Sequence, residues 1–235
     1  MEDKKFMGVS NNVLLVEKVY MDIRNKILSG EYPSGMHLVE AELTKEFKVS
    51  RVTMREASRR LVVDDLVDLI PNSGVRVRRL SYQDVIDLYA VREPLEALAA
   101  RLAAQAPPDK LKDLQMICSE GAAATARRDR INHRFLNNQF HLTLAAVTGN
   151  RTLVRVLERL NLQIVASQFM SFMRDEDFDI SQHDHEELLK AIFAGYSDKA
   201  ELIMRLHIKK GREFALSCLP RDLNNSSLLK QETGQ

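Results

Sequence analysis

Several features that define other classes of protein are missing from this chain of 235 residues. It has only two cysteines, Cys118 and Cys218, which lie far apart and lack metal-binding spacing, so two unremarkable thiols are expected rather than a disulfide. No apolar run approaches the roughly 20 residues that a membrane-spanning helix needs. The N-terminus has no hydrophobic region followed by a small-residue cleavage site, so no secretory signal is expected. We therefore expect a cytoplasmic protein, not bound to a membrane, with two domains of ordinary size.

Internal repeats and low-complexity tracts are also absent, and the net charge of +1 is close to zero. A balanced total does not exclude nucleic acid, because affinity for phosphate depends on where positive charge is placed. In this chain arginines are concentrated in one part of the N-terminal half: Arg51, Arg55, Arg59, Arg60, Arg76, Arg78 and Arg79. Their clustering indicates a surface that can bind nucleic acid.

Two short helical patterns flank a turn that ends at Ser50. In the first pattern, Leu43 and Phe47 share one helix face. The second has a narrow apolar stripe of Val52, Met54, Ala57 and Leu61. Its polar face has an arginine at each turn, at Arg51, Arg55 and Arg59. This arrangement is typical of a helix-turn-helix that enters a DNA major groove, where arginine can clamp a phosphate or the O6/N7 edge of guanine.

An arginine row can also be an ordinary solvated helix face, so the flanking segments decide between the two interpretations. Upstream, a helical pattern ends at Ser29–Gly30. Downstream, residues 66–70 and 75–78 are predicted to be strands around a hairpin turn at 71–74. Three helices followed by a hairpin form a winged helix, which favours DNA binding.

The segments 39–43, 49–57 and 71–74, together with Leu61, resemble the N-terminal domain of GntR-type transcriptional regulators. In that family, the start of the recognition helix and the wing contact operator DNA. The resemblance implies the following DNA-binding residues: Ser50, Arg51, Thr53, Arg55, Ser73 and Gly74. Ala41 stands where some members have an arginine. Lys48 replaces a common turn glycine, which predicts a non-glycine residue near φ > 0 or a slightly different turn.

Beyond residue 80 the strand signals disappear, and the pattern predicts helices. The first begins after Ser81 as N-cap and runs to about Ala106, with a kink or a division expected at Pro94. A second follows to about Arg128. Further helices are predicted over residues 132–148, 151–173, 181–194 and 198–219.

These patterns predict a mainly α protein in which a winged helix-turn-helix precedes an all-helical antiparallel bundle of six to seven helices. The expected organisation is a flexible N-terminus at 1–12, the winged helix at 13–80, the bundle at 81–220 and a disordered polar tail at 221–235.

Three histidines lie on separate predicted helices of the bundle: His141, His185 and His207. Neutral imidazole is the commonest transition-metal ligand, and helices can bring such positions together in a bundle core. Each could equally be an ordinary surface or core histidine, because no compact metal motif such as His-Glu-x-x-His is present. The residues alone leave both interpretations open.

Four segments resemble the effector domain of the FadR-type subfamily, called the FCD domain: residues 92–96, 137–141, 149–153 and 185–192. With the winged helix, the resemblance covers about residues 13–218. Many members bind a divalent metal through an aspartate and three histidines, which implies His141, His185 and His207 as ligands. Asn137 stands in place of the usual aspartate. Its amide oxygen brings no charge, so weaker binding and a preference for zinc or nickel over manganese or magnesium are expected. His133 and His183 are expected to be bystanders.

The resemblance also implies a small carboxylate effector bound at or beside the metal. Arg92 is the candidate partner for that carboxylate, and the alternative is a helical pair with Glu96 worth roughly 0.2–0.5 kcal/mol. We expect a bacterial homodimeric repressor that binds double-stranded operator DNA, and not an enzyme. Two alternatives stay open: a metal-dependent enzyme acting on a small acid, and a dimeric DNA-binding protein without an effector.

Overall fold

The computed structural model describes the backbone of residues 3–219 and the side chains of residues 14–219. It divides into two compact units. The first contains the residues up to Arg79 together with Glu158–Ser171, and the second contains Leu80–Leu157 and the chain from Phe172 onward. In the described part of the chain, no helix is both long enough and apolar enough to cross a membrane.

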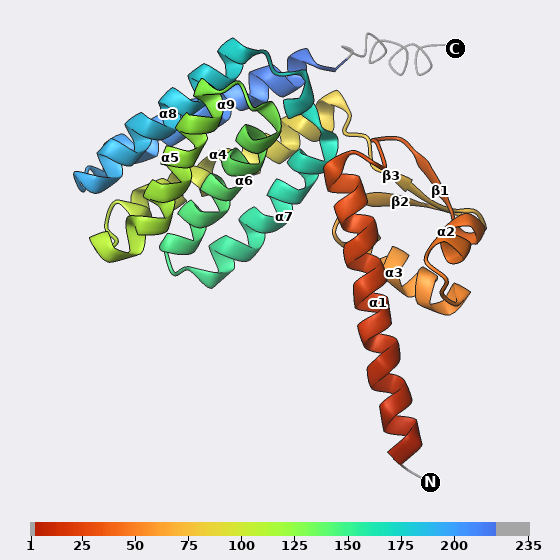
Figure 1. Ribbon diagram of the computed structural model, residues 1–235. Coiled ribbons are helices and arrows are strands. Elements are labelled where there is room, and N and C mark those ends of the chain that lie inside the picture. Colours follow the sequence, from red (N-terminus) through yellow and green to blue (C-terminus); the bar gives the residue numbers. More distant parts are fainter. Residues whose placement is uncertain (1–2, 220–235) are drawn as a thin grey trace, which may run out of the picture. The chain divides into compact units, whose positions relative to one another are not determined.

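In the first unit, the residues up to Arg79 form helices α1, α2 and α3 and a small sheet (Figure 1). The helices are α1 (Asp3–Ser29), α2 (Glu40–Glu46) and α3 (Arg51–Val63). Their apolar faces meet in one core, to which Ile23 and Ile27 of α1 and Met54, Ala57 and Leu61 of α3 contribute fully buried side chains. This core stabilises α3 by burial of one face, which leaves its opposite face in solvent.

The sheet has three antiparallel strands in the order β1-β3-β2. Strands β2 (Val67–Ile70) and β3 (Gly74–Val77) form the predicted hairpin. Strand β1 (His37–Val39) pairs with β3 and was not predicted, because three residues are too short to show an alternating pattern. The fold class predicted from the sequence, a winged helix-turn-helix followed by a helical domain, is confirmed.

Backbone geometry at Lys48 confirms the prediction drawn from its position in the turn. Its φ is 54°, a left-handed conformation that glycine adopts more easily than residues with a Cβ. The turn between α2 and α3 therefore keeps the shape that glycine usually provides. Asn72, in the turn between β2 and β3, also has a positive φ of 58°.

The second unit is helical. Helix α4 (Tyr82–Ala103) packs along α9 (Ser197–Ser217), and α5 (Lys112–Ala126) packs against α6 (Arg130–Val147) and α8 (Asp175–Phe193). A short 3-10 turn, η1 (Pro108–Leu111), precedes α5. Ser81 caps α4 as predicted, in a reciprocal pair of hydrogen bonds with Asp84. Pro94 lies inside α4 without dividing it.

Helix α7 (Arg151–Ser167) begins in the second unit and ends in the first. Gln168 then adopts a positive φ of 58°, and the 3-10 turn η2 (Phe169–Phe172) follows. Ala166 lies in the core of the first unit, and Leu162 packs against that core. The sequence analysis placed this whole segment in the helical domain, because hydrophobic periodicity predicts a helix and does not identify its packing partner.

The starts of two helices differ from the sequence-based expectation. Helix α8 begins at Asp175, six positions before the predicted Ser181, because the acidic residues 175–177 favour a helix N-terminus and apolar spacing does not register them. Helix α1 begins at Asp3, so residues 3–12, expected to be flexible, are helical. The tail expected to be disordered, 221–235, lies outside the described residues.

Candidate nucleic-acid interface and metal centre

Helix α3 is fixed at its N-terminus by Ser50. The Ser50 Oγ accepts a hydrogen bond from the Thr53 backbone N–H at 3.1 Å and lies 2.9 Å from the Thr53 hydroxyl. As an N-cap, Ser50 accepts from one of the backbone N–H groups that have no partner within the helix. The cap and the buried side chains of α3 together hold its first turn in place.

The exposed face of α3 presents arginines. The side chains of Arg55 and Arg59 are 63% and 76% exposed, and Arg51 is also exposed. The prediction that Val52 belongs to the buried apolar stripe is wrong, because Val52 is 72% exposed. At about 100° per residue it lies opposite Met54 and Ala57, so the solvent-facing side of α3 includes Val52.

Thr53 is 3% exposed, and its hydroxyl faces Ser50. The structure therefore does not bring Thr53 to the face that Arg51 and Arg55 share. Its position in the chain is that of a recognition-helix residue, but its side chain stabilises the helix start.

Glu40, at the start of α2, was missed as a site residue by the sequence analysis. Its Oε2 accepts a hydrogen bond from the Arg55 Nε at 2.8 Å. Its backbone N–H donates to the Ser73 carbonyl at 3.1 Å. Glu40 thus joins the wing hairpin to the arginine row. Glu40 and Arg55 are far apart in sequence, so no local spacing could have predicted the pair.

The wing residues Ser73 and Gly74 are closely packed against strand β1. The Ser73 Oγ lies 3.1 Å from His37 Nε2. Gly74 has a φ of +136°, and a Cβ at this position would lie 2.2 Å from the Leu38 carbonyl oxygen. Glycine is therefore required here by the approach of two strands. A groove of about 290 Å³ separates the hairpin from α3, and Arg55, Ser58 and Arg59 line its helical side.

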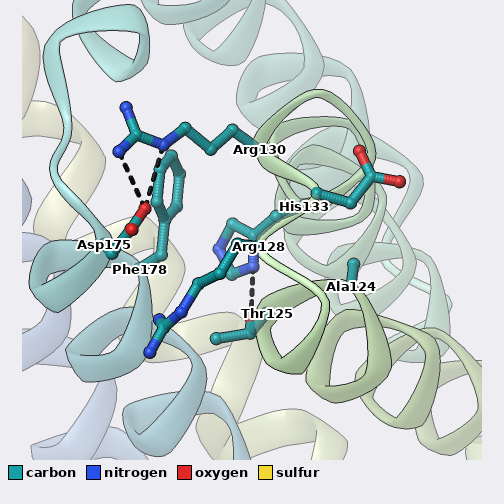
Figure 2. Close-up of a pocket in the computed structure, with 8 residues that line it drawn as sticks. Ala124, Thr125, Arg128, Arg130, His133, Asp175 and Phe178 are labelled. Carbon is teal, nitrogen blue, oxygen red and sulfur yellow. Dashed lines mark hydrogen bonds and ion pairs between the residues drawn. The ribbon is translucent and has the colours of Figure 1, made fainter.

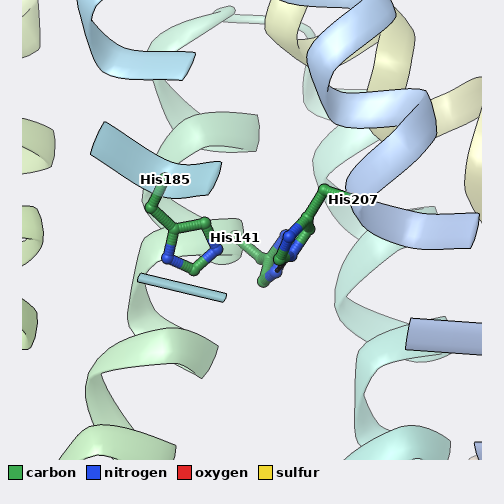
Figure 3. Close-up of side chains that lie close together, drawn as sticks. All are labelled: His141, His185 and His207. Carbon is green, nitrogen blue, oxygen red and sulfur yellow. Dashed lines mark hydrogen bonds between the residues drawn. The ribbon is translucent and has the colours of Figure 1, made fainter. Parts of the chain in front are cut away.

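In the second unit, three histidines converge from three helices (Figure 3). His141 lies on α6, His185 on α8 and His207 on α9. One ring nitrogen from each lies within 4.8 Å of the others. His141 and His185 are almost completely buried, and the His207 side chain is 11% exposed. The predicted histidine set is therefore brought together by the fold.

Two carboxylates orient two of these rings. The Glu96 Oε2 lies 3.1 Å from His141 Nδ1, and the Asp184 Oδ2 lies 3.3 Å from His207 Nδ1. Because a carboxylate only accepts hydrogen bonds, each Nδ1 carries a proton, and in the neutral tautomer this leaves the lone pair on Nε2. Burial opposes ionisation of Glu96, but His141 and Arg92 outweigh it and lower its pKa to about 2.

The three Nε2 atoms face a common centre. Those of His141 and His207 lie 3.4 Å apart, and His185 Nε2 is buried without a hydrogen-bond partner. Burial lowers the pKa of His185 well below its ordinary value, and nearby His207 and His141 lower it further. Two tetrahedral nitrogen ligands at about 2.0–2.1 Å from zinc lie roughly 3.3–3.4 Å from each other. The spacing of the His141 and His207 nitrogens and the unpartnered His185 nitrogen therefore fit a divalent metal.

Asn137 and Arg92 have partners of their own. The Asn137 Oδ1 accepts a hydrogen bond from the Ser181 hydroxyl at 3.3 Å. Arg92 is 6% exposed, and its Nε and Nη2 lie 3.1 and 3.0 Å from Glu96 Oε1. The alternative considered for Arg92, a helical pair with Glu96, is therefore present, and the pair is buried rather than solvated.

A fourth buried histidine lies in a separate pocket (Figure 2). The His133 Nδ1 lies 2.7 Å from the Thr125 hydroxyl, whose proton is donated to the Gly121 carbonyl. Burial lowers the pKa of His133 to about 4. The pocket measures about 10 Å³, which is room for one water molecule. His183 is exposed.

Comparison with known families gives two matches along the chain. The family described as bacterial regulatory proteins, gntR family, matches residues 15–77. The FCD domain matches residues 87–210, which is more than half of the chain.

Individual relatives are also transcriptional regulators. An uncharacterized HTH-type transcriptional regulator of Bacillus subtilis (strain 168), YdhC, is 30% identical over 74% of this chain and 78% of its own length. The HTH-type transcriptional repressor GlaR of Escherichia coli (strain K12) is 26% identical over 80% of this chain and 90% of its own length. The solved structure of E. coli McbR/YncC superposes with a TM-score of 0.75 at 18% identity, covering 87% of this chain and 98% of that one. The last match establishes a common fold.

Proposed function

Because this chain belongs to the GntR family of bacterial regulatory proteins and has an FCD domain, we propose that it is a repressor controlled by a small carboxylate and a divalent metal. The chain is a DNA-binding transcriptional regulator, and its relatives are regulators rather than enzymes. The observation that carries the proposed control is the set of three converging histidine nitrogens in the FCD domain.

The winged helix supplies the DNA-binding surface. Arg51 and Arg55 lie on the exposed face of α3, which suits insertion into the major groove of operator DNA. We assign the contacts to Arg51 and Arg55, with backbone contributions from Ser50 at the helix start and from the wing at Ser73 and Gly74. Thr53 supports these contacts through the helix cap. A homodimer acting in the cytoplasm would present two such helices to two operator half-sites.

The metal is held in this proposal by the Nε2 atoms of His141, His185 and His207. Neutral imidazoles favour zinc or nickel over manganese or magnesium. Asn137 lies one helical turn before His141, and its oxygen, which accepts one hydrogen bond from Ser181, has a second lone pair that could serve as a weaker fourth ligand. When bound, the metal supplies a Lewis-acidic position that can take a carboxylate oxygen.

Arg92 is the proposed second contact for the effector carboxylate. Its Nε and Nη2 are directed to a single oxygen of Glu96, and its guanidinium also lies against Tyr89, so an effector carboxylate would use only the N–H groups that these two partners leave. An effector at this position would change operator affinity only if it bound two states of the protein unequally.

Two other functions were considered. A metal-dependent enzyme is disfavoured because the relatives with this domain combination are transcriptional regulators. A DNA-binding protein without an effector would leave the buried histidine set without a role.

The test compares two histidines on the same helix. His185→Ala should remove the metal that the purified, untagged protein retains or takes up, as measured by elemental analysis. His183→Ala is the matched control, because His183 is exposed on α8. Operator fragments from around the gene are then titrated with hydroxy acids and sugar acids at fixed zinc. Wild-type protein that stays free of metal in micromolar zinc would refute the metal site, and unchanged operator affinity with every acid would refute the effector.

A further inference from the structure

Arg55 differs from its neighbours in the arginine row. Among the described residues, Arg51 has no ion-pair partner, and Arg59 has only a distant one at 3.6 Å, Glu56, on its own helix. Arg55 alone in this row is bound by a carboxylate from another helix, at 2.8 Å from Glu40. Its side chain is nevertheless 63% exposed. The guanidinium is therefore both oriented and accessible.

The Glu40 residue extends from a fixed point of the main chain. It is 24% exposed, and its residue begins α2 directly after strand β1. The Glu40 backbone N–H is bound to the Ser73 carbonyl, which fixes the main chain at this point to the wing hairpin. Because the Glu40 carboxylate extends from this fixed main chain and accepts from Arg55 Nε, it limits the rotation of the Arg55 side chain before any DNA arrives.

We propose that Glu40 positions Arg55 to read a guanine in the major groove, so that Glu40 is a determinant of base specificity. This role depends on the proposed DNA binding by α3. It specifies, in addition, that Arg55 contacts a base. It separates two roles of the row: Arg55 reads a base edge, and Arg51 contacts the phosphate backbone.

Charge favours a base over a phosphate as the target of Arg55. A phosphate bound by this guanidinium would lie close to the Glu40 carboxylate, and two anions on one cation repel each other. The O6 and N7 atoms of guanine are neutral acceptors and carry no such penalty. Among the described residues no carboxylate pairs with Arg51, so a phosphate on Arg51 meets no comparable repulsion.

Geometry favours the same target. Glu40 binds Arg55 through Nε, at the inner side of the guanidinium. The two terminal nitrogens stay available, and together they form the fork that matches O6 and N7 of one guanine. Because Glu40 restricts Arg55 before binding, less side-chain freedom is lost when the contact forms.

The test uses the full-length protein and duplexes that the wild type selects from a randomised library. Each G·C pair of the selected duplex is replaced in turn, and affinity is measured for each duplex and for an alternating A·T duplex. In the wild type, one replacement should cost roughly 5- to 150-fold in affinity, the range of a bidentate arginine–guanine contact. Arg55→Ala should abolish that preference and leave the dependence on salt concentration unchanged.

Glu40→Ala should reduce the preference at the same base pair, and Glu40→Gln should restore part of it, because an amide oxygen still accepts from Arg55 Nε. The matched control is Glu42→Gln, which removes one negative charge from an exposed position on the same helix. Glu42→Gln should raise affinity for all duplexes equally and leave the preference intact. Thermal unfolding of each variant checks that the winged helix is folded.

The proposal is overturned if Arg55→Ala weakens binding to every duplex alike and reduces the salt slope by about one, the behaviour of a phosphate contact. It is also overturned if Glu40→Ala and Glu42→Gln give the same profile across the duplexes. Failure of the wild type to enrich any duplex would instead count against the DNA-binding function itself.

Discussion

The Nε2 atoms of His141 and His207 lie 3.4 Å apart, and a different carboxylate faces the Nδ1 of each ring. Each carboxylate in turn binds a cation: Arg92 pairs with Glu96, and Lys210 pairs with Asp184. Two parallel chains of cation, carboxylate and imidazole therefore orient the ring nitrogens toward one centre. Such outer partners fix the tautomer of a metal-binding histidine and raise its basicity.

Asp184, which accepts a hydrogen bond from the proposed ligand His207, should raise the metal affinity of the site. Asp184→Asn keeps an acceptor for His207 Nδ1 but removes the charge, so zinc affinity should fall about 10- to 100-fold. Competition with a chromogenic chelator measures the change. Asp179→Asn on the same helix is the control, because Asp179 pairs with the exposed Arg128. Equal zinc affinity in the two variants would show that Asp184 does not support the site.

Arg92 should have a structural role that is separable from effector binding. Arg92→Met leaves the Glu96 carboxylate buried with one partner fewer, which should lower the free energy of unfolding by about 3–5 kcal/mol. The double variant Arg92→Met/Glu96→Leu should recover much of that loss, because no unpaired charge remains. Urea denaturation gives both values. If the single variant is as stable as the wild type, the buried pair does not stabilise the helical unit.

Stability should depend on pH through His133. Burial lowers its pKa from 6.5 to about 4 in the folded protein, so the unfolded chain binds more protons between these values. The free energy of unfolding should be highest above pH 6.5 and should decline as the pH falls toward 4. His185 and His207 shift in the same direction, so the wild type must be compared with His133→Phe, which keeps a ring against Phe178.

The variant should show a weaker decline in its urea midpoint over this pH range. His183→Phe serves as the control, since His183 is exposed on α8. Parallel pH curves for the wild type and His133→Phe would mean that His133 is not the titrating group.

Gly74→Ala should disrupt the wing. The new Cβ would lie 2.2 Å from the Leu38 carbonyl oxygen, at a φ of +136° that other residues rarely adopt. We expect a loss of at least about 1–3 kcal/mol in stability and weaker operator binding, because β1 leads directly into α2. Gly35→Ala is the control in the same unit: its φ is +85°, but its nearest atoms, from Arg79, are 3.8 Å away. A smaller effect of Gly74→Ala than of Gly35→Ala, by thermal unfolding, would contradict the strand-packing argument.

Local signals in the sequence predicted the features that depend on neighbouring residues. The Ser81 cap, the left-handed Lys48 and the hairpin around Asn72 all follow from short-range rules, and all are present. Features that depend on distant residues were not predictable in this way. The Glu40–Arg55 pair and strand β1 join segments that only the tertiary fold brings together.

The candidate metal site was predictable only in part from local signals in the sequence. Periodicity placed His141, His185 and His207 on separate helices but could not show that their side chains meet, and the resemblance to a family supplied that expectation. The supporting carboxylates, Glu96 and Asp184, were not assigned from sequence, because acidic residues on amphipathic helices are usually solvated. The DNA contact of Thr53 stays a prediction, and the burial of Thr53 beside the Ser50 cap could not be read from its position in the sequence.

Helix α7 limits how this protein can be divided for experiments. A fragment ending at residue 80 would include α1, α2, α3 and the sheet, but it would lack Leu162 and Ala166, which belong to the same core. The excised fragment would expose apolar surface that the intact chain covers, and aggregation would be the expected result. DNA-binding measurements on such a fragment would therefore report a damaged core as well as the absence of the effector domain.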